Sequence, residues 1–101
     1  MRRYSAGTMD VMPTLSDLER DEARERRRVL LAALAKTSTT QSELARKLNL
    51  AGERTAVTTV NRWCRGKATM SAATLRYVLS ILSLDPMWRP PADWQPPASP
   101  Q

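Results

Sequence analysis

Apolar side chains recur at intervals of three and four residues in several stretches of the chain, the spacing of one face of an α-helix. The last of these stretches carries Leu75, Val78, Leu79 and Leu82. No stretch sustains the alternation of apolar and polar positions that marks a half-buried strand. The pattern predicts an all-α fold, a small bundle of four helices near residues 17–36, 41–48, 55–64 and 72–83.

Capping signals mark where these helices begin and end. Ser16 to Glu19 and Thr40 to Glu43 have the capping-box pattern, in which a hydroxyl and a carboxylate satisfy backbone N–H groups at a helix start. Gly66 follows the third helix, where a left-handed residue commonly ends a helix. The first helix is the longest. Its charged half is either a solvated extension or a partner surface.

The second and third predicted helices are short and amphipathic. Leu44, Ala45 and Leu48 share one face of the second helix. One face of the third helix is apolar, and the opposite face is polar and cationic, with Thr58, Asn61, Arg62 and Arg65. Such a face suits base edges and phosphates in a major groove of DNA. Residues 41–66 therefore predict a helix-turn-helix.

The same residues resemble a known family. Gln41-x-x-Leu44-Ala45-x-x-Leu48, followed by Val60-x-x-Trp63 and Gly66-Lys67, is similar to the helix-turn-helix of the Cro and lambda-repressor family. The resemblance covers residues 29–82. It implies a compact helical domain that binds double-stranded DNA, usually as a homodimer on paired half-sites.

The turn between the two motif helices departs from this family. The family has about ten residues between the alanine of the first helix and the valine of the second, whereas Ala45 and Val60 are fifteen apart. The additional residues fall in 49–54, so we expect a longer turn. Asn49 stands where the family commonly has glycine, and asparagine tolerates the left-handed conformation expected there.

The geometry and the resemblance together give candidate DNA contacts. We expect the base-contacting residues to be Val57, Thr58, Asn61 and Arg62, because Arg62 can pair with guanine and Asn61 with adenine. Val57 is equally consistent with a core position. The expected phosphate-contacting residues are Gln41, Arg46, Lys47, Thr55, Arg65 and Lys67. Thr55 is also expected to cap the third helix.

The net charge of +6 is concentrated on this motif and its flanks. Residues 36–76 carry eight lysines and arginines against two glutamates, whereas the five arginines and five carboxylates of residues 17–28 cancel. A basic surface that coincides with a helix-turn-helix favours binding to nucleic acid. The balanced segment is expected to contribute little to that binding.

Composition argues against several other classes of protein. With one cysteine and no histidine, the chain lacks a ligand set for zinc. It also has no histidine base and no glycine-rich phosphate loop, so we do not expect an enzyme or a need for a cofactor. Trp63 is expected to anchor the core, and Cys64 to be a small buried hydrophobe. The longest uncharged apolar run, residues 29–35, is far below the roughly 20 residues of a membrane span. We expect a cytoplasmic, nucleoid-associated protein.

These inferences divide the chain into a disordered N-terminal arm (1–14), a helix-turn-helix DNA-binding domain (15–84) and an extended proline- and tryptophan-rich tail (85–101). Arg2 and Arg3 leave open that the arm reaches a minor groove. The expected function is sequence-specific DNA binding by a bacterial or phage transcriptional regulator, with repression as the default. The alternative is a protein-interaction module, an antitoxin or a phage factor acting on a host protein, that uses the tail or Leu15 and Leu18 of the first helix.

Overall fold

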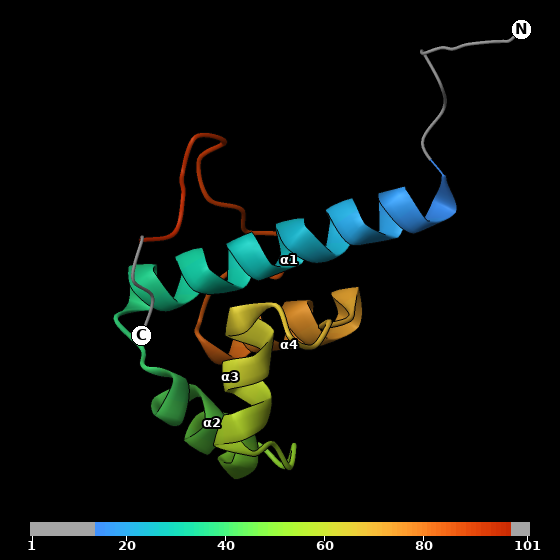
Figure 1. Ribbon diagram of the computed structural model, residues 1–101. Helices are drawn as coiled ribbons and strands as arrows, with labels where there is room; N and C mark the ends of the chain where they lie inside the picture. The colour runs from blue at the N-terminus through green and yellow to red at the C-terminus, as the bar shows by residue number, and fades with distance from the viewer. Residues whose placement is uncertain (1–13, 98–101) are drawn as a thin grey trace, which may run out of the picture.

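The computed structural model describes residues 14–97, which form four α-helices and no β-strand. The predicted N-terminal arm, Thr14 excepted, lies outside the described residues. Figure 1 shows the longest helix lying across the other three. The all-α prediction with four helices is confirmed, with the bounds α1 Leu15–Thr37, α2 Gln41–Leu50, α3 Val57–Arg65 and α4 Ala72–Ile81.

One hydrophobic core joins all four helices. Its largest fully buried side chains come from each helix and are Val29, Leu30, Leu44, Leu48, Val60, Cys64, Leu75, Val78 and Leu79. These are the positions that the three-and-four spacing predicts. Only the C-terminal half of α1 contributes to the core, and its N-terminal end projects beyond the other helices (Figure 1). Leu15 and Leu18 on that end are 72% and 46% exposed.

Capping boxes start α1 and α2, but the first one lies earlier than predicted. The Thr14 hydroxyl accepts a hydrogen bond of 3.1 Å from the Asp17 backbone N–H, and the Asp17 carboxylate accepts one from Thr14 at 3.4 Å. The box predicted at residues 16–19 is therefore wrong by two positions. The predicted box of Thr40 and Glu43 is confirmed, with distances of 3.1 Å and 2.8 Å.

The turn from α2 to α3 begins later than predicted. Asn49 is helical, because α2 continues to Leu50, and the left-handed position is taken by Gly52 with φ of 98°. Glycine adopts this conformation without steric cost. The α3 helix begins at Val57 with Ala56 as its N-cap and no side-chain cap. Thr55 is therefore not the helix cap that was predicted.

The end of α3 and the start of α4 follow the sequence signals. Gly66 has φ of 76°, and the Lys67 N–H donates to the Arg62 carbonyl at 2.8 Å, which closes the last turn of α3. The Ser71 hydroxyl caps α4 by accepting from the Thr74 N–H at 3.1 Å. Within residues 14–97, no helix combines the length and the apolar character that crossing a membrane requires.

The C-terminal segment has no helix beyond α4 in the described residues, yet it does not stand apart from the domain. Trp88 packs against the core, and Pro90 is buried. The Arg28 guanidinium on α1 donates through Nη1 to the Pro91 carbonyl at 3.1 Å and to the Trp94 carbonyl at 2.9 Å. The described part of the tail is irregular, and it contacts the helices through the Trp88 side chain and through the carbonyls of Pro91 and Trp94.

Candidate nucleic-acid interface

The side chain of Asn49 holds the long turn between α2 and α3. Its Nδ2 donates to the carbonyls of Ala45 and Thr55, each at 2.7 Å, and its Oδ1 accepts from the Thr55 N–H at 3.2 Å. One amide thus joins the last turn of α2 to the residues just before α3. The additional residues of the turn are fixed by these bonds, so α3 has a defined position relative to α2.

The outer face of α3 carries polar and cationic side chains. Val60 and Cys64 are buried, while Thr58, Arg62 and Arg65 are exposed at spacings of four and three residues. Val57 is 46% exposed at the first position of the helix, which places it outside the core. Two of the four expected base-contacting side chains, Thr58 and Arg62, therefore reach solvent on this face, whereas Val57 is exposed at the helix start on the side of Val60.

Asn61, the fourth expected base contact, is half-buried and has a partner within the protein. Its Nδ2 donates to Oε1 of Gln41 at 3.0 Å. Gln41 is the first residue of α2, so this bond links the N-terminal end of α2 to the middle of α3. An expected phosphate contact and an expected base contact are thus brought together, and each orients the other.

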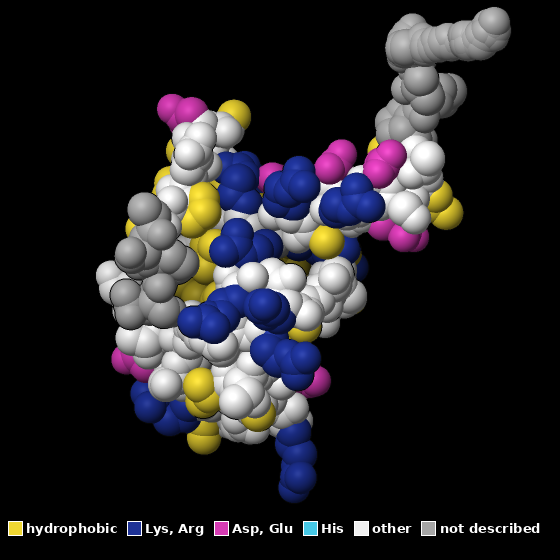
Figure 2. Space-filling view, in the orientation of Figure 1, with side chains coloured by type: hydrophobic (Ala, Val, Ile, Leu, Met, Phe, Trp, Pro, Cys, Tyr) yellow, Lys and Arg dark blue, Asp and Glu magenta, His cyan; other side chains and the backbone are white. Residues whose placement is uncertain are grey.

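The expected phosphate contacts differ in their access to solvent. Arg46 and Lys47 on α2, and Arg65 and Lys67 at the end of α3, are all exposed. Thr55 is 9% exposed, and its hydroxyl donates to the Glu53 carbonyl at 3.2 Å. We therefore withdraw Thr55 as a phosphate contact. Figure 2 shows lysine and arginine side chains gathered on one face, over α1 and α3.

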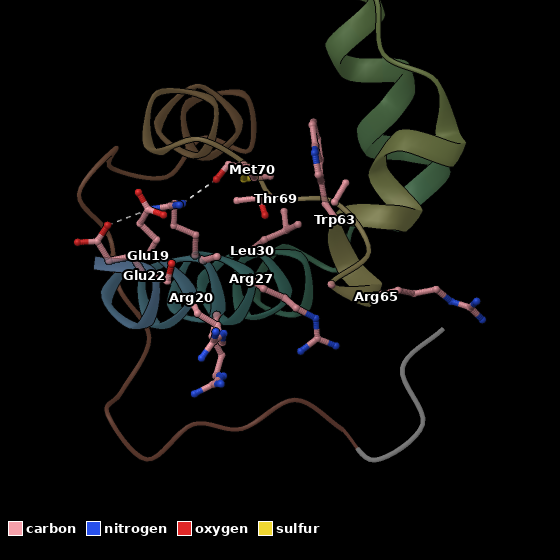
Figure 3. A pocket seen from close by; sticks show the side chains of 15 residues that line it. Glu19, Arg20, Glu22, Arg27, Leu30, Trp63, Arg65, Thr69 and Met70 are labelled. Atoms are coloured by element: carbon pink, nitrogen blue, oxygen red, sulfur yellow. Dashed lines mark hydrogen bonds and ion pairs between the residues drawn. The ribbon is translucent and has the colours of Figure 1, made fainter. Parts of the chain in front are cut away.

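Trp63 is less buried than predicted. It is half-buried and packs against the edge of the core, whereas Val60 and Cys64 occupy the interior. Its indole lines a groove of about 980 Å³ between α1 and residues 63–70. Figure 3 shows it beside this groove with Leu30 and Met70. The prediction of a core anchor is correct in direction and overstated in degree, because Trp63 packs against the core but is only half-buried.

Cys64 is buried, as predicted for a small apolar side chain. Burial raises the pKa of its thiol to about 11, so the thiol is protonated at neutral pH. A protonated, buried thiol is a poor nucleophile and a poor metal ligand. Among the described residues no group of three potential metal ligands is found.

Three consecutive arginines of α1 hold the domain together, a role that the sequence did not reveal. Arg26 Nε donates to the Met70 carbonyl at 2.6 Å, Arg27 Nε donates to the Cys64 carbonyl at 2.7 Å, and Arg28 reaches the C-terminal segment. Successive helical side chains point about 100° apart, so three neighbours reach three different segments. The net charge of residues 17–28 is zero, and this sum gives no indication that Arg26, Arg27 and Arg28 have separate roles.

No protein-family model matches the chain, and no curated protein or solved structure matches it. The assignment of function therefore rests on the arrangement of α2, α3 and the basic side chains around them.

Proposed function

We propose that this protein is a sequence-specific DNA-binding transcriptional regulator of bacterial or phage type, in which α2 and α3 are the two helices of a helix-turn-helix. The observation that carries the proposal is the outer face of α3, where Thr58 and Arg62 are exposed in the N-terminal two turns. In helix-turn-helix proteins the second helix lies in the major groove and its N-terminal residues meet the base edges.

Two further features support this role. The bond between Gln41 and Asn61 fixes the N-terminal end of α2 against α3, and free N–H groups at a helix N-terminus favour a phosphate. Exposed cations lie on both helices and just beyond them: Arg46 and Lys47 on α2, Arg65 at the last position of α3, and Lys67 two residues later. Such cations hold the phosphate backbone while α3 meets the bases. The resemblance to the Cro and lambda-repressor family adds the expectation of a homodimer and of repression by occlusion.

A second candidate function is a protein-interaction module on the same scaffold, because Leu15 and Leu18 are exposed on the projecting end of α1. A gel-shift assay separates the two. The protein is titrated against the DNA upstream of its own reading frame and against a scrambled duplex of equal composition, at physiological salt. Preference for the upstream DNA by about tenfold or more supports the regulator. Equal affinity for both duplexes contradicts it and favours the interaction module.

A further inference from the structure

The charges of residues 17–28 cancel in the sequence, and on α1 only two of the five carboxylates, those of Asp17 and Asp21, pair with Arg20 and Arg24. Arg20, Arg24 and Arg27 recur at spacings of four and three, so they form one row along the helix, called here the arginine row. Figure 3 shows Arg20 and Arg27 extending away from Met70, while Glu19 and Glu22 lie on another side of α1. Asp17 and Asp21 pair with two arginines of the row, so the row has one arginine in excess of its paired carboxylates, Arg27.

The arginine row is continuous with the cationic face of α3. Arg27 donates to the Cys64 carbonyl at the C-terminal end of α3, and its side chain lies against Gly66. Arg65, the next cation along, is exposed and lies one turn from Arg62 on the outer face of α3. Figure 2 shows lysine and arginine side chains on one face over both α1 and α3, with acidic side chains among those of α1. A positive surface thus runs from α3 onto the projecting part of α1.

The guanidinium groups of the row keep donors for a ligand. Arg20 pairs with Asp17 at 3.0 Å and Arg24 with Asp21 at 3.5 Å, and each pair uses only Nη1. The side chains of both arginines are more than half exposed, and exposed pairs of this kind contribute little energy. An arginine has five N–H donors. Within residues 14–97, neither Arg27 nor Arg65 forms an ion pair with a carboxylate.

We propose that the arginine row is a second track for the phosphate backbone of duplex DNA, beyond the base pairs that α3 meets. Arg20 and Arg27, the two ends of the row, are seven positions apart in the helix, or about 10 Å at 1.5 Å per residue. One DNA strand has a phosphate about every 3.4 Å along the helix axis, so the row matches about three phosphates. This inference rests on the proposed function, because the same DNA would occupy both surfaces.

The test measures binding of the full chain to random-sequence duplexes of about 12 and 30 base pairs by fluorescence anisotropy over a range of salt concentrations. The double variant Arg20→Gln/Arg24→Gln is compared with Arg76→Gln/Arg89→Gln, which removes two exposed arginines outside the row. On the long duplex, loss of two phosphate contacts per subunit should flatten the slope of log affinity against log salt by about 1.8 for each bound subunit. On the short duplex the two variants should differ little. Circular dichroism checks that both keep their helices.

Equal slopes for the two variants on the long duplex would overturn the proposal. The same variants are also titrated against polyglutamate, a probe for acidic proteins. If the Arg20→Gln/Arg24→Gln variant loses binding to polyglutamate but binds DNA like the wild type, the proposal is overturned and the row is assigned to an acidic protein. Because the random-sequence duplexes contain no specific site, this measurement tests the arginine row separately from the recognition of bases by α3. If the wild type shows no preference for its own upstream DNA but the row variant still flattens the slope, the track stands and the regulator fails. A wild type that binds no duplex at all overturns both.

Discussion

At the scale of single residues, Arg62 and Asn49 have different duties. Arg62 is exposed on the outer face of α3, and Asn49 closes the turn behind that face with three hydrogen bonds. The first is expected to act on DNA and the second on the position of α3. Substitutions at the two sites should therefore change different measurements.

Replacing Arg62 by alanine should cost about 1–3 kcal/mol on the specific site and relax the preference at one base position, because a bidentate pair with guanine is lost. Competition binding with base-substituted duplexes measures this. Arg65→Ala is the matched control, since it removes the same charge from the same helix and should weaken all sequences alike. If Arg62→Ala also weakens specific and scrambled DNA equally, Arg62 is only a phosphate contact.

Replacing Asn49 by aspartate keeps the size of the side chain but removes Nδ2, which donates to two carbonyls. Losing these two partly buried hydrogen bonds should lower the free energy of unfolding by about 0.5–1.5 kcal/mol. Urea denaturation measures it, with Leu50→Ala as the control, because Leu50 is 81% exposed. Equal stability of the aspartate variant and the wild type would show that the amide does not hold the turn.

At the scale of elements, the two capping boxes make stability depend on acid pH. Hydrogen bonds from Thr14 lower the pKa of Asp17, and those from Thr40 lower the pKa of Glu43. A carboxyl group whose pKa is lower in the folded state stabilises the fold above its unfolded pKa. That contribution is lost as the pH falls through the folded pKa.

We therefore expect the melting temperature to fall as the pH is lowered from about 5 to 3. The ordinary carboxyl pKa of the unfolded chain, about 4, lies within this range, and the lower pKa of each folded capping carboxyl extends the loss to more acid pH. The variants Asp17→Asn and Glu43→Gln should each show a weaker decline than the wild type. Glu53→Gln, a change in the turn outside both capping boxes, should follow the wild-type curve. Parallel curves for all four proteins would mean that the caps do not set the acid response.

Local sequence signals predicted the helices well, and non-local contacts account for what they missed. The spacing of apolar residues located the core side chains of all four helices, and Gly66 located the end of α3. The Thr14 cap was missed because residues 14–17 and residues 16–19 both fit the capping-box pattern and overlap in the sequence. The roles of Arg26, Arg27 and Arg28 were not predictable, since their carbonyl partners lie 37 to 66 residues away in sequence.

At the scale of the whole molecule, the C-terminal segment is part of the domain. Trp88 packs against the core, and Arg28 pairs with Glu25 while it holds two carbonyls of the segment. The paired guanidinium lowers the pKa of the Glu25 carboxyl. The segment therefore covers apolar surface that four helices of this length leave open.

Replacing Trp88 by alanine should lower the free energy of unfolding by about 1–3 kcal/mol, less than for a fully buried tryptophan because the ring is half-buried. The neighbouring change Met87→Ala is the control, since Met87 is 67% exposed. Denaturation curves give both values. A tryptophan variant as stable as the methionine variant would mean that the segment lies on the surface without stabilising it.

The central claim is that α3 reads a DNA sequence, and selection from a pool of random duplexes tests it most directly. The wild type should enrich a two-fold symmetric sequence with half-sites about one helical turn apart, as expected for a dimer of this type. The Arg62→Ala variant, selected in parallel, should lose the preference at one position in each half-site. Enrichment of no sequence by the wild type, or of the same sequence by both proteins, would contradict the claim.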